Sequence, residues 1–137
     1  MKSYLKTTAG FVLSATMATA SFGATVNVGE LQGFTGPLES MIGPMSGGAN
    51  LAVTEANASG NYLYGTITVV QGDSVCIDPA VAIAQAEKMV NDDNVMAIMG
   101  PNCSGNTGAV ITNVLVPNGI VSISPSATSP ALTTLED

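Results

Sequence analysis

The chain has 137 residues, which is room for one small domain, and it carries a formal net charge of −7. It contains no histidine, so histidine-based catalytic triads and histidine-ligated zinc centres are excluded, and we expect no metal and no cofactor. Arginine is absent, and the only lysines are Lys2, Lys6 and Lys88, too few to neutralise the phosphates of a nucleic acid. Nucleic-acid binding is therefore excluded as a function.

Residues 1–23 have the layout of a secretory signal peptide. Two lysines come first, an apolar middle runs from about Ala9 to Met17, and small residues follow. Cleavage after Ala20 and cleavage after Gly23 both fit, and the second leaves an N-terminal lobe over 24–137. An uncleaved anchor is the alternative, but hydroxyl side chains interrupt the run of about 20 apolar residues that a membrane-spanning helix needs. We expect an exported, periplasmic protein that is not stably inserted in the membrane after cleavage.

The chain has two cysteines, Cys76 and Cys103. In an oxidising compartment two cysteines allow one intramolecular pairing, so a structural disulfide is the default interpretation. A redox-active pair is the alternative, but its usual Cys-x-x-Cys spacing is absent.

The first predicted strand is the valine-rich segment Thr25–Leu31, which breaks at the loop Gly33–Pro37. The spacing of apolar residues then predicts a helix within 38–58. Because Gly43-Pro44 and Gly47-Gly48 weaken the middle of this segment, we expect the regular helix to begin near Ser46 or later.

A second strand is predicted over Leu63–Gln71. Asp78 as N-cap and Pro79 at the first helical position then predict the start of a helix that continues through Ala80–Val90. The short unbroken apolar run Val95–Met99 is typical of a buried parallel strand.

The last predicted elements are a helix over Asn106–Leu115, with Ser104 or Asn106 as N-cap, and a strand over Ile120–Ile123. The order is therefore β-α-β-α-β-α-β, in which strands alternate with helical crossovers. We expect an α/β fold with a parallel, doubly wound, Rossmann-like sheet.

Ligands of such sheets collect at the carboxyl ends of the strands. Three loops fall there in this sequence, and each is crowded with Gly, Ser and Thr: Gly33–Pro37, Gly100–Thr107 and Ser124–Ser129. We interpret their convergence as the candidate site.

The loop from Gly100 to Gly108 leads from a strand into a helix, where free backbone N–H groups favour an anion. It has neither the Gly-x-Gly-x-x-Gly pattern of dinucleotide sites nor the Gly-Lys-Ser/Thr of phosphate loops. Without a nearby lysine or arginine, a carboxylate is favoured over a phosphate. The alternative is a glycine-rich turn that binds nothing.

The Ser126-Ala127-Thr128 loop offers hydroxyls and carbonyls that can accept from an ammonium or donate to a carboxylate. Its alternative is a satisfied Ser/Thr turn between two prolines. Together the two loops suit a small zwitterion. No histidine activates Ser104 or Ser124, and Lys88 lies within a predicted helix, so we expect binding and no enzyme activity.

Several motifs occur in the same order as in a known family: the signal peptide, Gly33-Phe34-Thr35-Gly36-Pro37-Leu38-Glu39-Ser40, Cys76 followed by Asp78-Pro79, Gly100-x-x-Cys103-Ser104, and Ile123-Ser124-Pro125-Ser126-Ala127-Thr128. With them the chain resembles the branched-chain amino-acid-binding (leucine-binding) proteins. These are periplasmic substrate-binding components of ABC transporters with the type I fold. The resemblance runs over the whole mature chain.

The resemblance implies contacts for an amino-acid ligand. Ser104 would meet the carboxylate through its hydroxyl and backbone N–H, and Thr128 would add its own hydroxyl and N–H. Ser126 would offer its carbonyl to the α-ammonium. Met41 takes the place, within a couple of residues, of an aromatic residue that the family often sets over the ligand. The resemblance also implies a disulfide between the two cysteines.

The resemblance further implies that the protein captures a small amino acid between two lobes and delivers it to the permease subunits of an importer. An extracytoplasmic sensor of the same fold, binding amino acids or amides, is the alternative. Family members are more than twice as long as this sequence, so we expect 24–137 to form only part of the first lobe.

Overall fold

The computed structural model describes residues 23–62 and 65–136. Its elements in chain order are β1 (Ala24–Gln32), α1 (Glu39–Ala58), β2 (Gly65–Asp73), α2 (Pro79–Asn91), β3 (Val95–Met99), α3 (Ser104–Val110), the π-helical turn η1 (Ile111–Leu115), α4 (Val116–Asn118), β4 (Val121–Ile123) and the 3₁₀ turn η2 (Pro130–Thr134). Residues 1–22 of the expected signal peptide and the first two residues of the second predicted strand lie outside the described residues. None of the helices in the described part is both long and apolar enough to cross a membrane.

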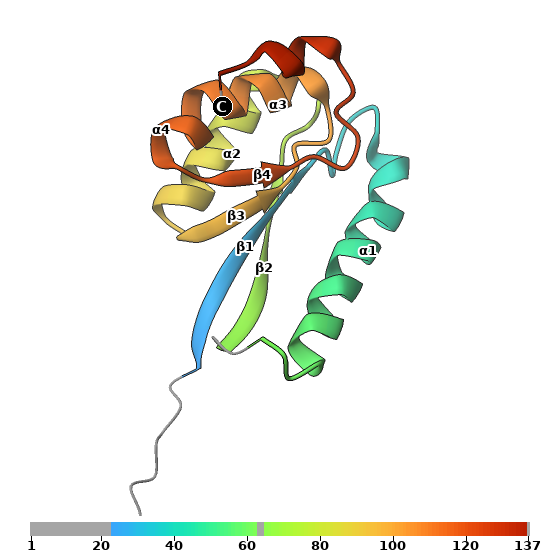
Figure 1. The fold of residues 1–137 in the computed structure, drawn as a ribbon. Coiled ribbons are helices and arrows are strands. Elements are labelled where there is room, and N and C mark those ends of the chain that lie inside the picture. The colour runs from blue at the N-terminus through green and yellow to red at the C-terminus, as the bar shows by residue number, and fades with distance from the viewer. Residues whose placement is uncertain (1–22, 63–64, 137) are drawn as a thin grey trace, which may run out of the picture.

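The four strands form one parallel sheet in the order β2-β1-β3-β4 (Figure 1). The chain winds outward from β1 first to one side and then to the other, so the order reverses between β1 and β3. Such a switch point is where ligands of open α/β sheets bind. The predicted parallel, doubly wound α/β fold is confirmed.

The main hydrophobic core lies on the face of the sheet that α2, α3 and η1 cover (Figure 1). Apolar side chains from both the strands and these helices build it: Leu31, Ala82, Ala86, Met89, Val95, Ile98, Val110, Val114 and Leu115. The predicted start of α2 is confirmed, since the carboxylate of Asp78 accepts a hydrogen bond from Ala80 N at 2.9 Å. This core fixes the positions at which the sheet delivers its loops.

The opposite face of the sheet carries α1, and its contact with α1 is partly polar (Figure 1). Glu30 is 1% exposed, and its carboxylate accepts hydrogen bonds from Gln32 Nε2 at 2.7 Å, Ser46 Oγ at 3.2 Å and Gln71 Nε2 at 2.9 Å. A buried carboxylate is stable only with such partners. Ile42 and Ser46 are the buried residues of α1.

The expectation that regular helix begins near Ser46 is wrong, because α1 is continuous from Glu39 and includes Pro44. Proline lacks the N–H that would bond to the carbonyl of Ser40, one turn earlier. Both residues are exposed, so water can satisfy that carbonyl. The burial of Ile42 then outweighs the loss of one helical hydrogen bond.

The third predicted helix begins earlier than expected, at Ser104, and neither Ser104 nor Asn106 is its N-cap. The N-cap is Cys103, which makes no capping hydrogen bond through its side chain. Asn106 is buried and donates through Nδ2 to the carbonyl of Ser74 at 2.8 Å. Ser104 Oγ accepts hydrogen bonds from the N–H groups of Thr128 and Ser129. The side chains of both predicted N-cap residues thus have partners far away in the sequence.

Candidate functional site

The loops after β1 and β3 are joined across the switch point of the sheet (Figure 1). The backbone N–H of Gly33 donates to Asn102 Oδ1 at 2.9 Å, and Asn102 is buried. Gly100, at the end of β3, has φ +114°, and a Cβ there would collide with the backbone oxygen of Leu31. Only glycine permits this close approach of the two strand ends.

A disulfide between Cys76 and Cys103, with a Cα–Cα distance of 5.5 Å, joins the loop after β2 to the loop after β3. The predicted pairing is therefore confirmed. The loop after β1 packs against the same bridge, since a Cβ on Gly33 would lie 3.3 Å from the Cβ of Cys76. Three of the four loops at this edge thus meet at one covalent link.

The loop after β2 is also tied to the loop after β1 through Asp73. Its carboxylate accepts from Thr35 Oγ1 at 2.6 Å and from the backbone N–H of Val75 at 2.9 Å. Partial burial raises the pKa of Asp73, but these bonds, with further ones from the backbone N–H groups of Thr35 and Phe34, more than offset it. The pKa therefore lies below its ordinary value of 3.8.

Ser104 and Thr128, two residues predicted to bind ligand, lie within hydrogen-bonding distance of each other. Ser104 Oγ accepts from the backbone N–H of Thr128 at 3.0 Å and from that of Ser129 at 3.1 Å. Ser104 is half-buried at the start of α3, whereas Thr128 is exposed. The fold therefore brings together the two loops that sequence analysis paired.

The hydroxyl of Ser126 is bonded inside the protein, because it donates to the carbonyl of Asn102 at 2.7 Å. The neighbouring Ser124 donates to the carbonyl of Pro101 at 2.5 Å and accepts from the N–H of Ala127 at 3.0 Å. The alternative predicted for this loop, a satisfied Ser/Thr turn between two prolines, therefore describes the side chains of Ser124 and Ser126.

Met41 lies on a different element from the other predicted ligand residues, as the third residue of α1. Its side chain is 52% exposed. The beginning of α1 follows the loop after β1 and lies near the same edge of the sheet as the other loops (Figure 1). The first turn of α1, which contains Met41, therefore lies near the edge of the sheet that carries the other three predicted residues.

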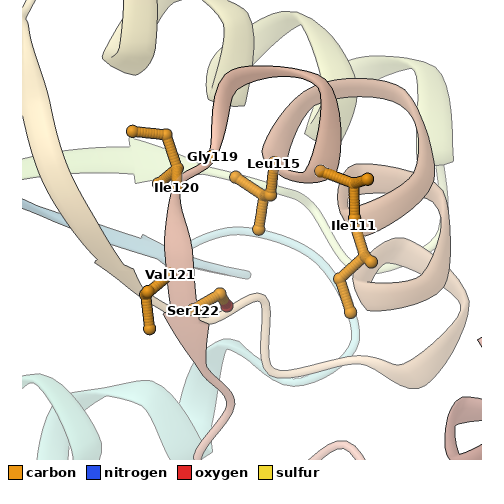
Figure 2. Close-up of a pocket in the computed structure, with 7 residues that line it drawn as sticks. Ile111, Leu115, Gly119, Ile120, Val121 and Ser122 are labelled. Atoms are coloured by element: carbon orange, nitrogen blue, oxygen red, sulfur yellow. The ribbon is translucent and has the colours of Figure 1, made fainter. Parts of the chain in front are cut away.

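Two open hollows in the described part of the chain border the helical run of α3, η1 and α4. One of about 470 Å³ opens between the helical run and β4, where Figure 2 shows Ile111 and Leu115 on one side and Ile120 and Val121 on the other. A second, of about 450 Å³, lies between α3 and η2 and borders Ser104 and Ser129. Neither hollow is lined by Ser126, Thr128 or Met41, whereas the second borders Ser104. We call the loops that carry Ser104, Ser126 and exposed Thr128 the rim.

The two loops that carry Ser104 and Thr128 belong to a neutral part of the chain. No charged residue occurs between Asp93 and Glu136. Within the described residues there is no group of three His, Cys, Asp or Glu side chains that could hold a metal ion. The rim therefore presents hydroxyls, backbone N–H groups and carbonyls, which suit hydrogen bonding to a small polar ligand.

A family model described as a periplasmic binding protein matches residues 25–135. The chain belongs to the periplasmic binding protein family. Its relatives are amino-acid-binding components of ABC transporters, and the predicted family is confirmed. The family consists of substrate-binding proteins rather than enzymes.

Two curated relatives illustrate the similarity. The leucine-specific-binding protein of Salmonella typhimurium strain LT2 is 29% identical over 133 residues, which is 97% of this chain and 35% of the relative. The Leu/Ile/Val-binding protein of Escherichia coli K12 is 34% identical over 105 residues, which is 69% of this chain and 28% of the relative. The chain thus spans about a third of the length of these periplasmic binding proteins.

Solved structures agree with this assignment. The branched-chain amino acid transporter substrate binding protein of Streptococcus pneumoniae, in complex with isoleucine, has a TM-score of 0.73 and 34% identity, and the match covers 80% of this chain and 31% of that chain. A leucine binding protein of Thermotoga maritima has a TM-score of 0.70 at 20% identity over 80% of this chain and 30% of that chain, a likeness of fold. The fold is that of type I periplasmic binding proteins.

Proposed function

We propose that this chain carries one side of the ligand site of a substrate-binding protein, which captures a small zwitterionic amino acid for an ABC importer. The observation that carries the proposal is the hydrogen bonding of Ser104 Oγ to the N–H groups of Thr128 and Ser129. It places a hydroxyl and two loop N–H groups together at the carboxyl edge of a doubly wound sheet, where such sheets bind ligands.

In this proposal the ligand carboxylate lies against Ser104 and Thr128. Ser104 Oγ accepts two hydrogen bonds, so its own proton remains available for donation to a carboxylate. The hydroxyl of exposed Thr128 supplies a second donor. Hydrogen bonds to a charged acceptor are stronger than neutral ones, which suits a site without basic side chains.

The α-ammonium group is proposed to donate to the backbone carbonyl of Ser126. The side chain of Ser126 is bonded to Asn102, which leaves the carbonyl as its group for a ligand. Because no charged residue occurs between Asp93 and Glu136, this side of the site favours a ligand whose own charges balance. A zwitterion meets that condition, whereas a free anion or cation meets no opposite charge there.

The side chain of the ligand is proposed to lie near Met41. This residue is exposed, apolar and unbranched, so it can adapt to aliphatic side chains. The relatives named for leucine, isoleucine and valine support an aliphatic ligand. They also support transport rather than sensing, since the Streptococcus relative is a transporter component.

An open rim buries too little of a small ligand for tight binding. We therefore propose that a second lobe closes over it in the full-length natural protein, as the greater length of the relatives indicates. Export by residues 1–23 and a periplasmic location belong to the same proposal, with permease subunits as partners.

Isothermal titration calorimetry of the full-length natural protein tests the proposal. We expect leucine, isoleucine or valine to bind with a Kd in the micromolar range or below. Two leucine analogues, 4-methylpentanoate without the ammonium and 3-methylbutylamine without the carboxylate, should each bind at least about tenfold more weakly, because each loses charge-assisted hydrogen bonds.

The matched variants are Ser104→Ala and Thr54→Ala. Thr54 donates through its hydroxyl to the carbonyl of Asn50 on the exposed surface of α1, away from the site. Ser104→Ala should weaken amino-acid binding by about tenfold to a hundredfold, and Thr54→Ala should not change it. Absence of binding across aliphatic, polar and acidic amino acids would refute the proposal, as would equal affinity in Ser104→Ala.

A further inference from the structure

A ladder of serine hydroxyls joins the segment after β4 to the loop after β3. Serines at three alternate positions donate to the carbonyls of three consecutive residues: Ser122 to Gly100 at 2.5 Å, Ser124 to Pro101 at 2.5 Å and Ser126 to Asn102 at 2.7 Å. Each hydrogen bond of the serine ladder lies one step closer to the rim than the one before it.

The serine ladder begins at Ser122, within the paired part of β4, and continues past the end of the strand. β3 and β4 pair in register from Ala97 to Met99, and the last backbone bond runs from Gly100 N to the carbonyl of Ile123 at 2.8 Å. The residue after Gly100 is Pro101, which has no N–H to donate to a neighbouring strand. Ser124 and Ser126, which follow β4, therefore bond to this loop through their side-chain hydroxyls and not through strand pairing.

The three serines reach the loop from different backbone conformations. Ser122 lies in β4, whereas Ser124 and Ser126 follow the strand in a segment that bends, where Ser124 Oγ also accepts from the N–H of Ala127 at 3.0 Å. Figure 2 shows the first of them, Ser122, pointing to the opposite side of β4 from Val121.

The serine ladder ends directly beside the proposed ligand site. Two residues after Ser126 is Thr128, whose N–H donates to Ser104 Oγ at 3.0 Å. We propose that Ser126 is a positioning residue: its bond to Asn102 holds the loop that carries Thr128 in register with the loop that carries Ser104. The ligand carboxylate then meets donors already in place, which reduces the ordering cost of binding. This role rests on the proposed function.

The serine ladder can be tested without any ligand. Residue-resolved amide hydrogen exchange on the full-length natural protein reports how often the N–H groups of Thr128 and Ser129 open. In Ser126→Ala we expect both to exchange about tenfold faster, as for the loss of one hydrogen bond. Ser122→Ala, whose bond is farthest from the rim, should have a smaller effect, and Ser126→Thr, which keeps the hydroxyl, should restore slow exchange.

Thr54→Ala is the matched control, because it too removes a hydroxyl that donates to a backbone carbonyl. It should leave exchange at Thr128 unchanged. In calorimetry, Ser126→Ala should bind the amino acid about tenfold more weakly although it retains the carbonyl proposed to receive the ammonium.

Unchanged exchange at Thr128 in Ser126→Ala would overturn the inference, as would failure of Ser126→Thr to restore it. If Ser126→Ala does not fold, exchange at Thr128 in Ser126→Cys, whose thiol is a weaker donor than a hydroxyl, decides in the same way. Failure of the proposed function gives a different result: the unaltered protein then binds no amino acid, whereas the exchange rates still report on the serine ladder.

Discussion

Asp73 is a single carboxylate that connects two loops of the candidate site. Its hydrogen bonds from Thr35 and Val75 lower its pKa in the folded protein below 3.8, whereas the unfolded chain keeps the ordinary value. A lowered pKa stabilises the fold in full above the unfolded pKa, and this contribution is lost as the pH falls through the folded pKa. The fold should therefore lose stability in acid below about pH 4.

We expect Asp73→Asn to lower the free energy of unfolding at about pH 6 by roughly 1 kcal/mol, because an amide accepts these bonds less well than a carboxylate. The difference from the unaltered protein should shrink below about pH 4, where Asp73 becomes protonated. Urea denaturation across this pH range measures it. Asp92→Asn, at an exposed acid, is the control, and a difference that stays constant with pH would contradict the argument.

Glu30 illustrates what sequence patterns cannot show about a single residue. It lies in β1, and nothing local indicates that it is buried with Gln32, Ser46 and Gln71 as partners. The last two of these come from α1 and β2, and only the packing of α1 on the sheet brings them together. Buried polar groups of this kind depend on long-range contacts, which periodicity does not report.

At the scale of the element, α1 departs most from its sequence pattern. It contains Gly43, Pro44, Gly47 and Gly48, all unfavourable within helices, yet it is continuous over Glu39–Ala58. A Cβ added at Gly43, Gly47 or Gly48 would have no atom within 4 Å of it. These glycines therefore weaken the helix without serving a close contact.

We expect Gly48→Ala to raise the free energy of unfolding by about 0.5 to 1 kcal/mol, since alanine loses less backbone entropy in a helix and has room here. Gly43→Ala is the matched comparison, because it precedes Pro44 and a Cβ before proline disfavours helical backbone. It should give no gain, or a loss. Thermal and chemical denaturation of both variants measure the effect, and equal stabilisation by the two would show this account of α1 to be wrong.

The elements with strong local signals were predictable. Asp78 followed by Pro79 marked the start of α2, and the apolar run of β3 gave its bounds of Val95–Met99. The start of α3 was not predictable, because Ser104 and Asn106 use their side chains for partners in distant loops instead of capping the helix. Capping patterns assume that such side chains bond locally.

At the scale of the whole molecule, the disulfide between Cys76 and Cys103 is the covalent constraint on the edge that carries the site. It closes a chain segment with a sequence separation of 27 residues. Such a bridge reduces the conformational freedom of the unfolded chain.

We expect reduction of this bridge, or the double variant Cys76→Ser with Cys103→Ser, to lower the free energy of unfolding by about 3 to 4 kcal/mol. Guanidinium denaturation of the oxidised and reduced protein measures the difference, and the double variant should match the reduced protein. If oxidised and reduced protein unfold at the same denaturant concentration, the bridge does not stabilise the fold.

The candidate site was predictable as a meeting of loops but not as a set of bonds. Parallel strands deliver their carboxyl ends to one edge, so the proximity of Ser104 and Thr128 follows from element order. Which hydroxyl binds which carbonyl depends on distances of a few tenths of an ångström. Only the folded chain shows that the hydroxyl of Ser126 is bonded to the carbonyl of Asn102 and that Met41 lies on α1, apart from the loops of the other predicted residues.

The absence of charged side chains between Asp93 and Glu136 bears on how ligand binding at the proposed site should depend on salt. Dissolved ions screen interactions between exposed charges, but they weaken short hydrogen bonds between neutral groups far less. Because neither the loops around Ser104 and Thr128 nor the proposed zwitterion carries a net charge, we expect the affinity of the proposed site to depend little on ionic strength.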